Sequence, residues 1–216
     1  MNSYLRTTIC AFLLIGFRSA NSGSLPYDAW RLGFFVPDYM EVWIETADVI
    51  DIQGNFYNRA MSGNAAIRSP ANSTGDLKGW PAKPGWGKGK YVLRADLPKQ
   101  LYVRWQSLVE PQTYQMTIDI PESTRKIMRK EEKAFCAFDG KSITDYREAL
   151  VIGLAPGGIA KVWVIGPCLP PIEVTRVQAE VDPRGPNEGK SGGQYDPPSA
   201  ASNAHIQKFG VPYGSW

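Results

Sequence analysis

A single histidine, His205, occurs in the 216-residue chain, so any catalytic triad or dyad that uses imidazole must be built around it. It lies in a polar C-terminal segment, where a lone histidine is usually a plain surface residue. The three cysteines, Cys10, Cys136 and Cys168, are far apart in sequence and form no close-spaced set of metal ligands. These residues therefore predict no metal site, no bound cofactor and no complete set of groups for nucleophilic catalysis.

Glu41, Trp43 and Glu45 alternate along a stretch that favours β structure, so they share one face of an extended strand. At strand rise the two carboxylates lie roughly 13 Å apart. That separation exceeds the roughly 5 to 9.5 Å between the paired carboxyl groups of glycosidases. We expect a solvent-exposed strand face with one packed aromatic, and a carboxylate pair drawn from different strands stays open as an alternative.

Aromatic and basic side chains are interspersed within a long irregular segment, residues 69–90. Indole rings stack on sugars or peptides and lysines pair with anions, which makes this segment a candidate binding loop. The alternative is a rigid loop whose tryptophans cover the edge of the fold. Disordered linkers rarely hold two tryptophans, so both interpretations pack the loop against the protein. The candidate residues are Trp80, Lys83, Trp86, Lys88 and Lys90.

The first 22 residues have the order of a secretory signal peptide. Arg6 precedes an apolar run, residues 9–17, and no acidic residue accompanies it. The run is far shorter than the roughly 20 residues that a membrane-spanning helix needs. Residues 14–16 (Leu-Ile-Gly) also have the form that precedes the lipid-bearing cysteine of bacterial lipoproteins, but Phe17 stands where that cysteine would be. We therefore expect export, no transmembrane span after signal removal, and no lipid anchor.

The mature chain, residues 23–216, is long enough for one domain with a substantial core. The formal net charge is +3 and falls to +1 when Arg6 and Arg18 leave with the signal, so the charge does not indicate a nucleic-acid partner. Cys136 and Cys168 then remain as an even pair in a compartment that permits disulfides. They are a candidate bridge, with two buried thiols as the alternative.

Strand signals dominate the mature chain, and Ala155-Pro156-Gly157-Gly158 between two apolar segments predicts a tight hairpin. Two helices are expected, one over residues 123–135 and a short one around residues 200–209 that Gly210 closes. Residues 69–90 and 182–199 are long loops. This pattern predicts a mainly β, antiparallel, sandwich-like single domain with one or two short helices. The predicted strands cover residues 30–36, 40–52, 101–109, 113–120, 149–154, 159–165 and 172–181.

Six motifs are spread over nearly the whole mature chain: residues 25–30 (LPYDAW), 39–45 (YMEVWIE), 79–81 (GWP), 102–108 (YVRWQSL), 157–163 (GGIAKVW) and 210–216 (GVPYGSW). Together they resemble the bacterial domain-of-unknown-function family 2931. The resemblance implies a small exported protein of Gram-negative bacteria, often lipoprotein-like, and it assigns no catalytic residues. Phe17 departs from the lipoprotein pattern. Some small secreted proteins of this kind are encoded beside antibacterial toxins as immunity proteins, which is an analogy and not a site.

The sequence favours a non-catalytic protein of the periplasm or cell envelope that binds a protein partner, such as a toxin or effector, in the manner of an immunity protein. The alternative is a carbohydrate-binding module or a glycan-acting enzyme of the cell envelope, with carboxylates from separate strands beside Trp80. A structural envelope component without a small ligand is the third possibility.

Overall fold

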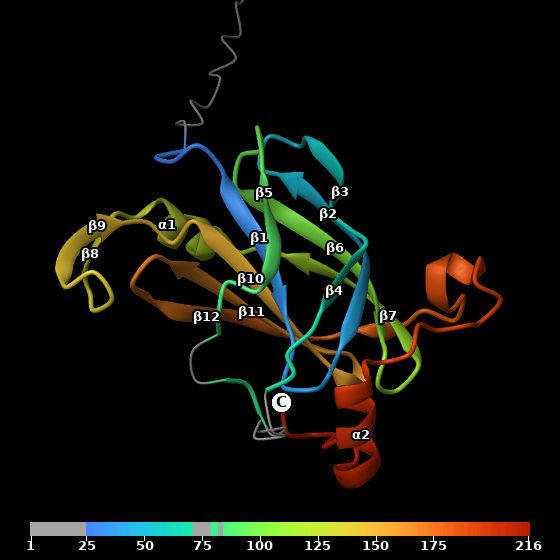
Figure 1. The fold of residues 1–216 in the computed structure, drawn as a ribbon. Helices are drawn as coiled ribbons and strands as arrows, with labels where there is room; N and C mark the ends of the chain where they lie inside the picture. The colour runs from blue at the N-terminus through green and yellow to red at the C-terminus, as the bar shows by residue number, and fades with distance from the viewer. Residues whose placement is uncertain (1–24, 71–78, 82–83) are drawn as a thin grey trace, which may run out of the picture.

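Two β-sheets packed face to face form the fold in the computed structural model, which describes residues 25–70, 79–81 and 84–216 (Figure 1). One sheet has five strands in the order β12-β11-β10-β1-β5. The other has six, in the order β13-β7-β6-β2-β3 with β4 also paired to β2. The predicted mainly β, sandwich-like architecture is confirmed, and the predicted signal segment lies outside the described residues.

The five-stranded sheet takes its strands from three separate parts of the described chain. They are β1 (Trp30–Phe35), β5 (Lys88–Val92), β10 (Ala149–Ala155), β11 (Ile159–Gly166) and β12 (Leu169–Gln178). β1 and β10 run parallel, and every other pair in the sheet is antiparallel. The parallel pair joins segments more than a hundred residues apart, so no hairpin constrains their directions.

The six-stranded sheet is antiparallel throughout its described pairs. Its strands are β2 (Val42–Asp51), β3 (Phe56–Met61), β4 (Asn64–Ala66), β6 (Pro98–Ser107), β7 (Gln112–Asp119) and β13 (Glu180–Val181). A separate hairpin pairs β8 (Glu132–Cys136) with β9 (Lys141–Asp145). Five strands, β3, β4, β5, β8 and β9, were not predicted from the sequence, because they are short and lack a continuous apolar face.

The main core lies between the two sheets and is continuous from one to the other. Trp30 and Leu32 of β1 and Val162 of β11 meet Ile44 of β2 and Trp105 of β6, all of them buried. Successive residues of a strand point to opposite faces of the sheet, so apolar residues that alternate with these core residues lie on the outer face. They must be buried there by other side chains. The outer face of the five-stranded sheet has such a cover, a smaller apolar cluster around Trp163.

The predicted hairpin over residues 155–158 is confirmed as the connection between β10 and β11. Gly157 and Gly158 have φ values of 76° and 75° there, a left-handed conformation that glycine adopts without a Cβ clash. The reversal brings Ala155 opposite Ile159 and places the wholly apolar β10 beside β11, in which Lys161 is the one charged residue.

The first helix, α1 (Glu122–Arg129), is shorter than predicted. The expectation that it reaches residue 135 is wrong, because Lys130 is already extended and β8 begins at Glu132. Met128 of α1 is buried, but Phe135 is 64% exposed on a strand. Residues 132–136 gain backbone hydrogen bonds from β9, a pairing that helical periodicity cannot reveal.

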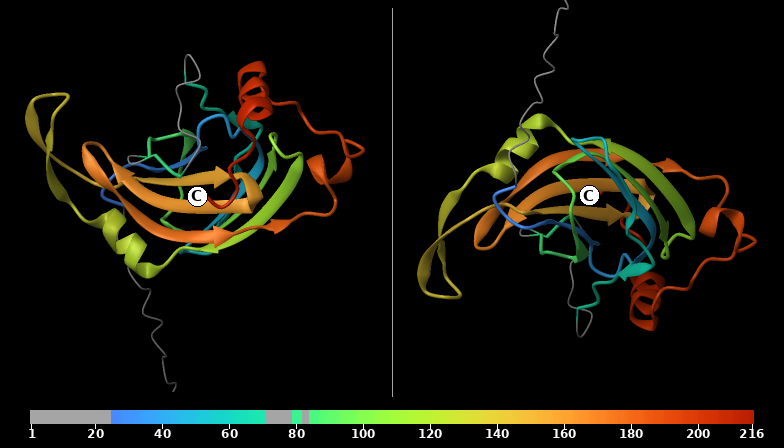
Figure 2. Two further views of the ribbon diagram at one scale, coloured as in Figure 1. Left: turned by 90° about the horizontal axis from the view of Figure 1, so that it is seen from below. Right: turned by 90° about the horizontal axis from the view of Figure 1, so that it is seen from above.

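The second helix, α2 (Ala200–Phe209), confirms the prediction for residues 200–209. The Ser199 hydroxyl accepts a hydrogen bond from the Ser202 amide at the start of the helix, and Gly210 ends it with a φ of 74°. Figure 2 shows α2 packed at one end of the sandwich, away from the β8–β9 hairpin. No helix in the described part of the chain is long and apolar enough to cross a bilayer.

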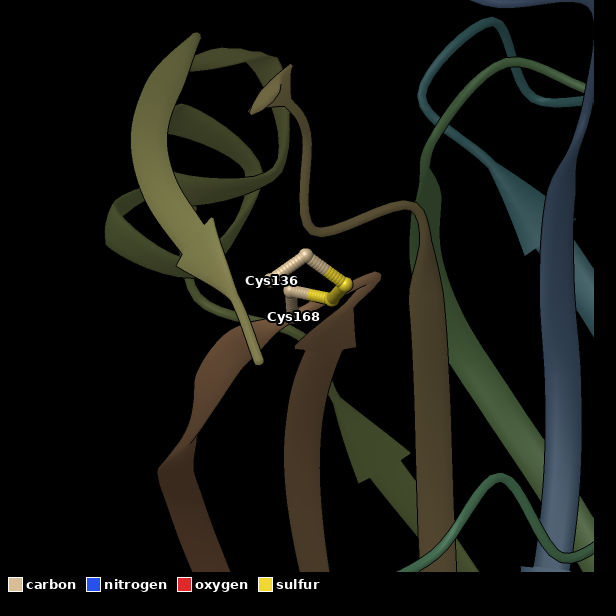
Figure 3. Close-up of a disulfide and its surroundings, with 2 residues drawn as sticks. All are labelled: Cys136 and Cys168. Carbon is tan, nitrogen blue, oxygen red and sulfur yellow. A yellow bond between two sulfur atoms is a disulfide. The ribbon is translucent and has the colours of Figure 1, made fainter. Parts of the chain in front are cut away.

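The predicted bridge between Cys136 and Cys168 is present (Figure 3). It joins the end of β8 to the turn between β11 and β12, with 5.1 Å between the two Cα atoms. The β8–β9 hairpin is a separate two-stranded sheet, and such a pair is marginally stable on its own. The bridge therefore attaches this hairpin to the five-stranded sheet.

Candidate functional site

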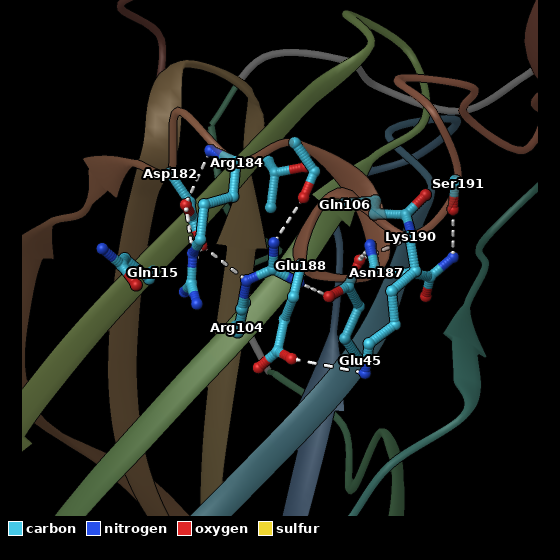
Figure 4. A network of polar contacts seen from close by, with 12 residues as sticks. Glu45, Arg104, Gln106, Gln115, Asp182, Arg184, Asn187, Glu188, Lys190 and Ser191 are labelled. Atoms are coloured by element: carbon cyan, nitrogen blue, oxygen red, sulfur yellow. Dashed lines mark hydrogen bonds and ion pairs between the residues drawn. The ribbon is translucent and has the colours of Figure 1, made fainter.

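The segment after β13 crosses the outer face of the six-stranded sheet and covers polar side chains there. Figure 4 shows the contacts along its first part, where it passes over β2, β6 and β7. Residues 182–199 were predicted as a long loop, and the structure confirms that they are irregular, with one short 3-10 turn at Pro186–Gly189. The loop is packed down through buried ion pairs.

Arg104 of β6 is the centre of this network and is only 1% exposed. Its Nε donates a hydrogen bond to Asp182 Oδ2 at 2.7 Å, and its guanidinium also pairs with the Glu45 carboxylate. The Gly185 carbonyl oxygen accepts a further hydrogen bond from the same guanidinium. One buried cation is thus shared by two buried carboxylates, an arrangement in which neither carboxylate is left uncompensated.

Glu45 reaches the network because β2 is irregular at this point. The register of β2 against β6 shifts between Ile44 and Thr46, and such a bulge re-aims the side chain of the extra residue. Besides Arg104, the Glu45 carboxylate accepts hydrogen bonds from the Gln106 side-chain amide and the Asn187 backbone amide, both at 2.7 Å. These contacts join β2, β6 and the segment after β13, so the carboxylate has a structural use.

Asp182 is the first residue of the segment that covers the sheet (residues 182–199, here called the covering segment) and is bound by two arginines. Arg184 donates hydrogen bonds to it, the shortest at 2.7 Å, and Arg104 donates another. The Arg184 contact is the main cause that holds the Asp182 pKa far below its ordinary value, with Arg104 adding to it against the effect of burial. The Asp182 carboxylate is therefore ionised at any pH near neutral.

Glu41 fixes the other end of the covering segment and is 1% exposed. Its carboxylate accepts hydrogen bonds from the Ser199 amide and the Ser202 hydroxyl, each at 2.7 Å, and from the Ser199 hydroxyl. The expectation of a solvent-exposed face at Glu41 and Glu45 is wrong, because a segment more than a hundred residues away covers both carboxylates. A negative charge at the first turn of α2 also interacts favourably with the helix dipole.

His205 is buried, 5% exposed, so its interpretation as a plain surface residue is wrong. Its ring stacks on Tyr39 with 3.9 Å between centroids and 8° between planes, and Phe209 lies 4.6 Å away. Nδ1 has no hydrogen-bond partner among the described residues. Burial is the main cause that lowers the His205 pKa, and the nearby Lys208 charge lowers it further while Asp38 opposes the change. The imidazole thus packs α2 onto the fold in its neutral form.

We expect acid to weaken this packing. Because the folded-state pKa of His205 is lowered, the neutral ring contributes stability that is complete above the unfolded pKa of about 6.5 and is lost as pH falls below it. Urea unfolding at about pH 7.5 and about pH 5.5 should show a smaller pH-dependent loss in His205→Phe than in the wild type. Equal losses in the two proteins would contradict the assignment.

The two tryptophans of the candidate loop cover the outer face of the five-stranded sheet. Trp80 meets Phe35 and Trp163 edge-on, with ring centroids 5.7 and 5.5 Å apart. A Cβ at Gly153 would lie 2.5 Å from the Trp80 ring, so the glycine admits the indole against β10. The guanidinium of Arg31 lies 5.9 Å from the Trp86 ring centroid. Packing explains both indoles, and a binding role for them stays a prediction.

The lysines of the same loop are separated from the tryptophans. In the pairing of β5 with β1, Lys88 lies opposite Phe34 and Lys90 opposite Leu32, whose side chains point into the core. Paired residues of antiparallel strands share a face, so both lysines lie on the other side of the sheet from Trp86. They are exposed because β5 is the edge strand. Lys83 lies outside the described residues.

An open pocket of about 330 Å³ lies beside the Arg104 network, between β2 and the covering segment. Trp43, Arg59 and Lys190 are among its lining residues, together with Glu45 and Glu188. Trp43 and Glu45 stand together in the sequence, but neither Arg59 nor Lys190 could be linked to them there, because nothing local connects residues 59 and 190 to that strand. Among the described residues, no group of three or more His, Cys, Asp or Glu side chains could hold a metal ion.

Comparison with known proteins identifies a family and assigns no activity. No curated protein and no solved structure matches the chain. Residues 18–214 match the family described as protein of unknown function (DUF2931), which covers most of the sequence. The resemblance seen in the six short motifs is thereby confirmed, and the chain belongs to the DUF2931 family.

Proposed function

We propose that the mature chain is an exported, non-catalytic protein of the periplasm or cell envelope that binds another protein, as an immunity protein binds a toxin or effector. Its N-terminal sequence supports export, and the Cys136–Cys168 bridge suits an oxidising compartment. The side chains best suited to chemistry are engaged in holding the fold together: Glu41, Glu45 and His205 all fasten the C-terminal segment.

The edge of the five-stranded sheet carries the proposal. β5 is the last strand in that sheet, and no described strand pairs with its outward edge. An extended segment of a partner can add to such an edge through backbone hydrogen bonds, with side-chain contacts supplying specificity. Tyr91 is 53% exposed and Leu93 is 68% exposed at the same place, which offers apolar contacts beside the backbone.

Charge decides which partner fits this edge. Residues 84–95 contain Lys88, Lys90 and Arg94 and no acidic residue, and all three cations are exposed. Lysines on an edge strand prevent indiscriminate pairing with other sheets. A partner that does pair must neutralise them, so the proposal assigns an acidic extended segment of a protein to this edge.

Charge reversal at the edge tests the proposal. The bait is the mature protein, and partners are captured from a native envelope extract and identified by mass spectrometry. Lys88→Glu with Lys90→Glu is expected to weaken capture of a stoichiometric partner at least about tenfold, equivalent to about 1.4 kcal/mol. The matched control, Lys133→Glu with Lys141→Glu, changes charge equally on exposed lysines of the β8–β9 hairpin and should retain the partner.

Two results would contradict the proposal. Equal loss in both double variants would show a general effect of charge, and capture that neither variant changes would move the partner surface away from β5. Thermal unfolding of each bait is measured alongside, because exposed lysines at these positions should be replaceable with little loss of stability.

A further inference from the structure

Arg104 and Glu45 form what we call the floor of the pocket beside Trp43, and their charges are already neutralised by ion pairs within the protein. Arg104 is shared between Glu45 and Asp182, and the Gly185 carbonyl oxygen accepts a further hydrogen bond from it. The floor therefore offers no free positive charge, and a phosphate or another strong anion would gain little by binding against it. The same contacts hold the floor rigid, which lowers the entropy cost of binding a ligand there.

One wall of the pocket is aromatic. Trp43 on β2 is half-buried and lines the pocket. Gly63 lies next to it, and even a Cβ at that position would approach the ring only to 3.9 Å. The absence of a side chain at Gly63 leaves part of the indole accessible. An accessible indole beside polar groups suits a ligand that has both an apolar face and polar edges.

Another part of the pocket lining, which we call the rim (residues 187, 188 and 190 with Arg59), includes two residues in an unusual backbone conformation. Asn187 and Glu188 both adopt left-handed φ values, 52° and 55°, which residues other than glycine seldom do. The Asn187 amide is bound to Glu45 and its side chain to Ser191, so the surrounding contacts maintain the strain. Strain of this kind concentrates at binding sites, where it positions particular side chains. Here it places Asn187 and Glu188 in the pocket lining.

The accessible part of the rim mixes hydrogen-bond donors and acceptors. The Lys190 Nζ lies 3.6 Å from the Glu188 Oε2, and the two side chains are 81% and 54% exposed. Arg59 adds a guanidinium to the same lining. A carboxylate accepts hydrogen bonds whereas an ammonium or guanidinium donates them, and a sugar hydroxyl does both. A neutral pyranose, with hydroxyls around an apolar ring face, matches this combination better than an ion does.

We propose that this pocket binds a neutral saccharide, with one ring against Trp43 and its hydroxyls bonded to Glu188, Lys190 and Arg59. Its volume of about 330 Å³ is at the lower end for ligand pockets and suits one or two sugar rings. The site is formed by the six-stranded sheet and the covering segment, whereas the proposed protein partner binds at the edge of the other sheet. Either proposal can therefore fail without the other.

Calorimetric titration of the mature protein with chitotriose and maltotriose, two neutral oligosaccharides, tests the proposal. At least one should bind, and Trp43→Ala and Glu188→Ala should each weaken it at least about tenfold. Glu188 is exposed, so its variant keeps the test valid if Trp43→Ala fails to fold. Trp86→Ala is the matched aromatic control and should bind normally, as should the Lys88→Glu, Lys90→Glu double variant.

Three results would overturn the saccharide site. The first is no binding of either oligosaccharide with a dissociation constant below about 10 mM. The second is binding that Glu188→Ala leaves unchanged or that Trp86→Ala abolishes, which would move the site elsewhere. The third is binding of hyaluronate fragments, an anionic saccharide probe, in the absence of binding by both neutral ones, because the neutralised floor predicts no preference for anions.

Discussion

Arg104→Met is expected to lower the free energy of unfolding by about 3–5 kcal/mol. The side chain is almost completely buried and lies between Glu45 and Asp182, which are nearly as buried as it is. Methionine fills a similar volume without charge, so both carboxylates would be left in the interior without their shared cation. The cost comes mainly from the Glu45 carboxylate, which loses its cation, and less from Asp182, which keeps its contact with the half-exposed Arg184. It exceeds the value of the lost contact, since a buried ion pair contributes little net stability by itself.

Urea or guanidinium unfolding measures the effect, and Arg184 provides a matched control. Arg184 also binds Asp182, but its side chain is 51% exposed, so Arg184→Met should cost no more than about 1 kcal/mol. Adding Glu45→Gln and Asp182→Asn to Arg104→Met should recover part of the loss, because no buried charge then lacks a partner. A loss below about 1 kcal/mol for Arg104→Met alone would show that the cluster is not needed for stability.

Removal of the disulfide is expected to have the second large effect. Cys136 and Cys168 are 32 residues apart, and closing a loop of that length stabilises a fold by about 3–4 kcal/mol in the chain-entropy treatment. The cross-link reduces the conformational freedom of the unfolded chain and also fastens the β8–β9 hairpin to the turn after β11. The Cys136→Ser, Cys168→Ser double variant should therefore unfold at a markedly lower denaturant concentration.

A reductant is the control for the cysteine variant. With dithiothreitol present, the wild type should unfold close to the midpoint of the double variant, and the double variant should not respond to the reductant at all. Alkylation before and after reduction, read by mass, reports the state of both thiols directly. An unchanged midpoint in the double variant would mean that the hairpin is held by other contacts.

Elements whose signals are local could be predicted from the amino-acid sequence. The glycines at residues 157 and 158 specify a reversal between two apolar strands, and Ser199 and Gly210 bound α2 through contacts within a few residues. Alternating apolar residues indicated the long strands and the two-sheet architecture, because burial of one face is imposed on each strand separately. The bridge between Cys136 and Cys168 was one of two possibilities in the sequence, because they are the only two cysteines outside the predicted signal segment, and the structure shows the bridge.

Tertiary structure alone decided which residues meet. The end of α1 depends on the pairing of β8 with β9, and β5 is a strand because β1 provides its hydrogen bonds. Glu41 and Glu45 look like solvent-exposed strand residues in the sequence, but their bonds to Ser199 and Asn187 span 158 and 142 residues. Contacts at such separations leave no periodic trace in the chain. The Arg104 cluster and the pocket beside Trp43 therefore exist only once the covering segment has folded across the sheet.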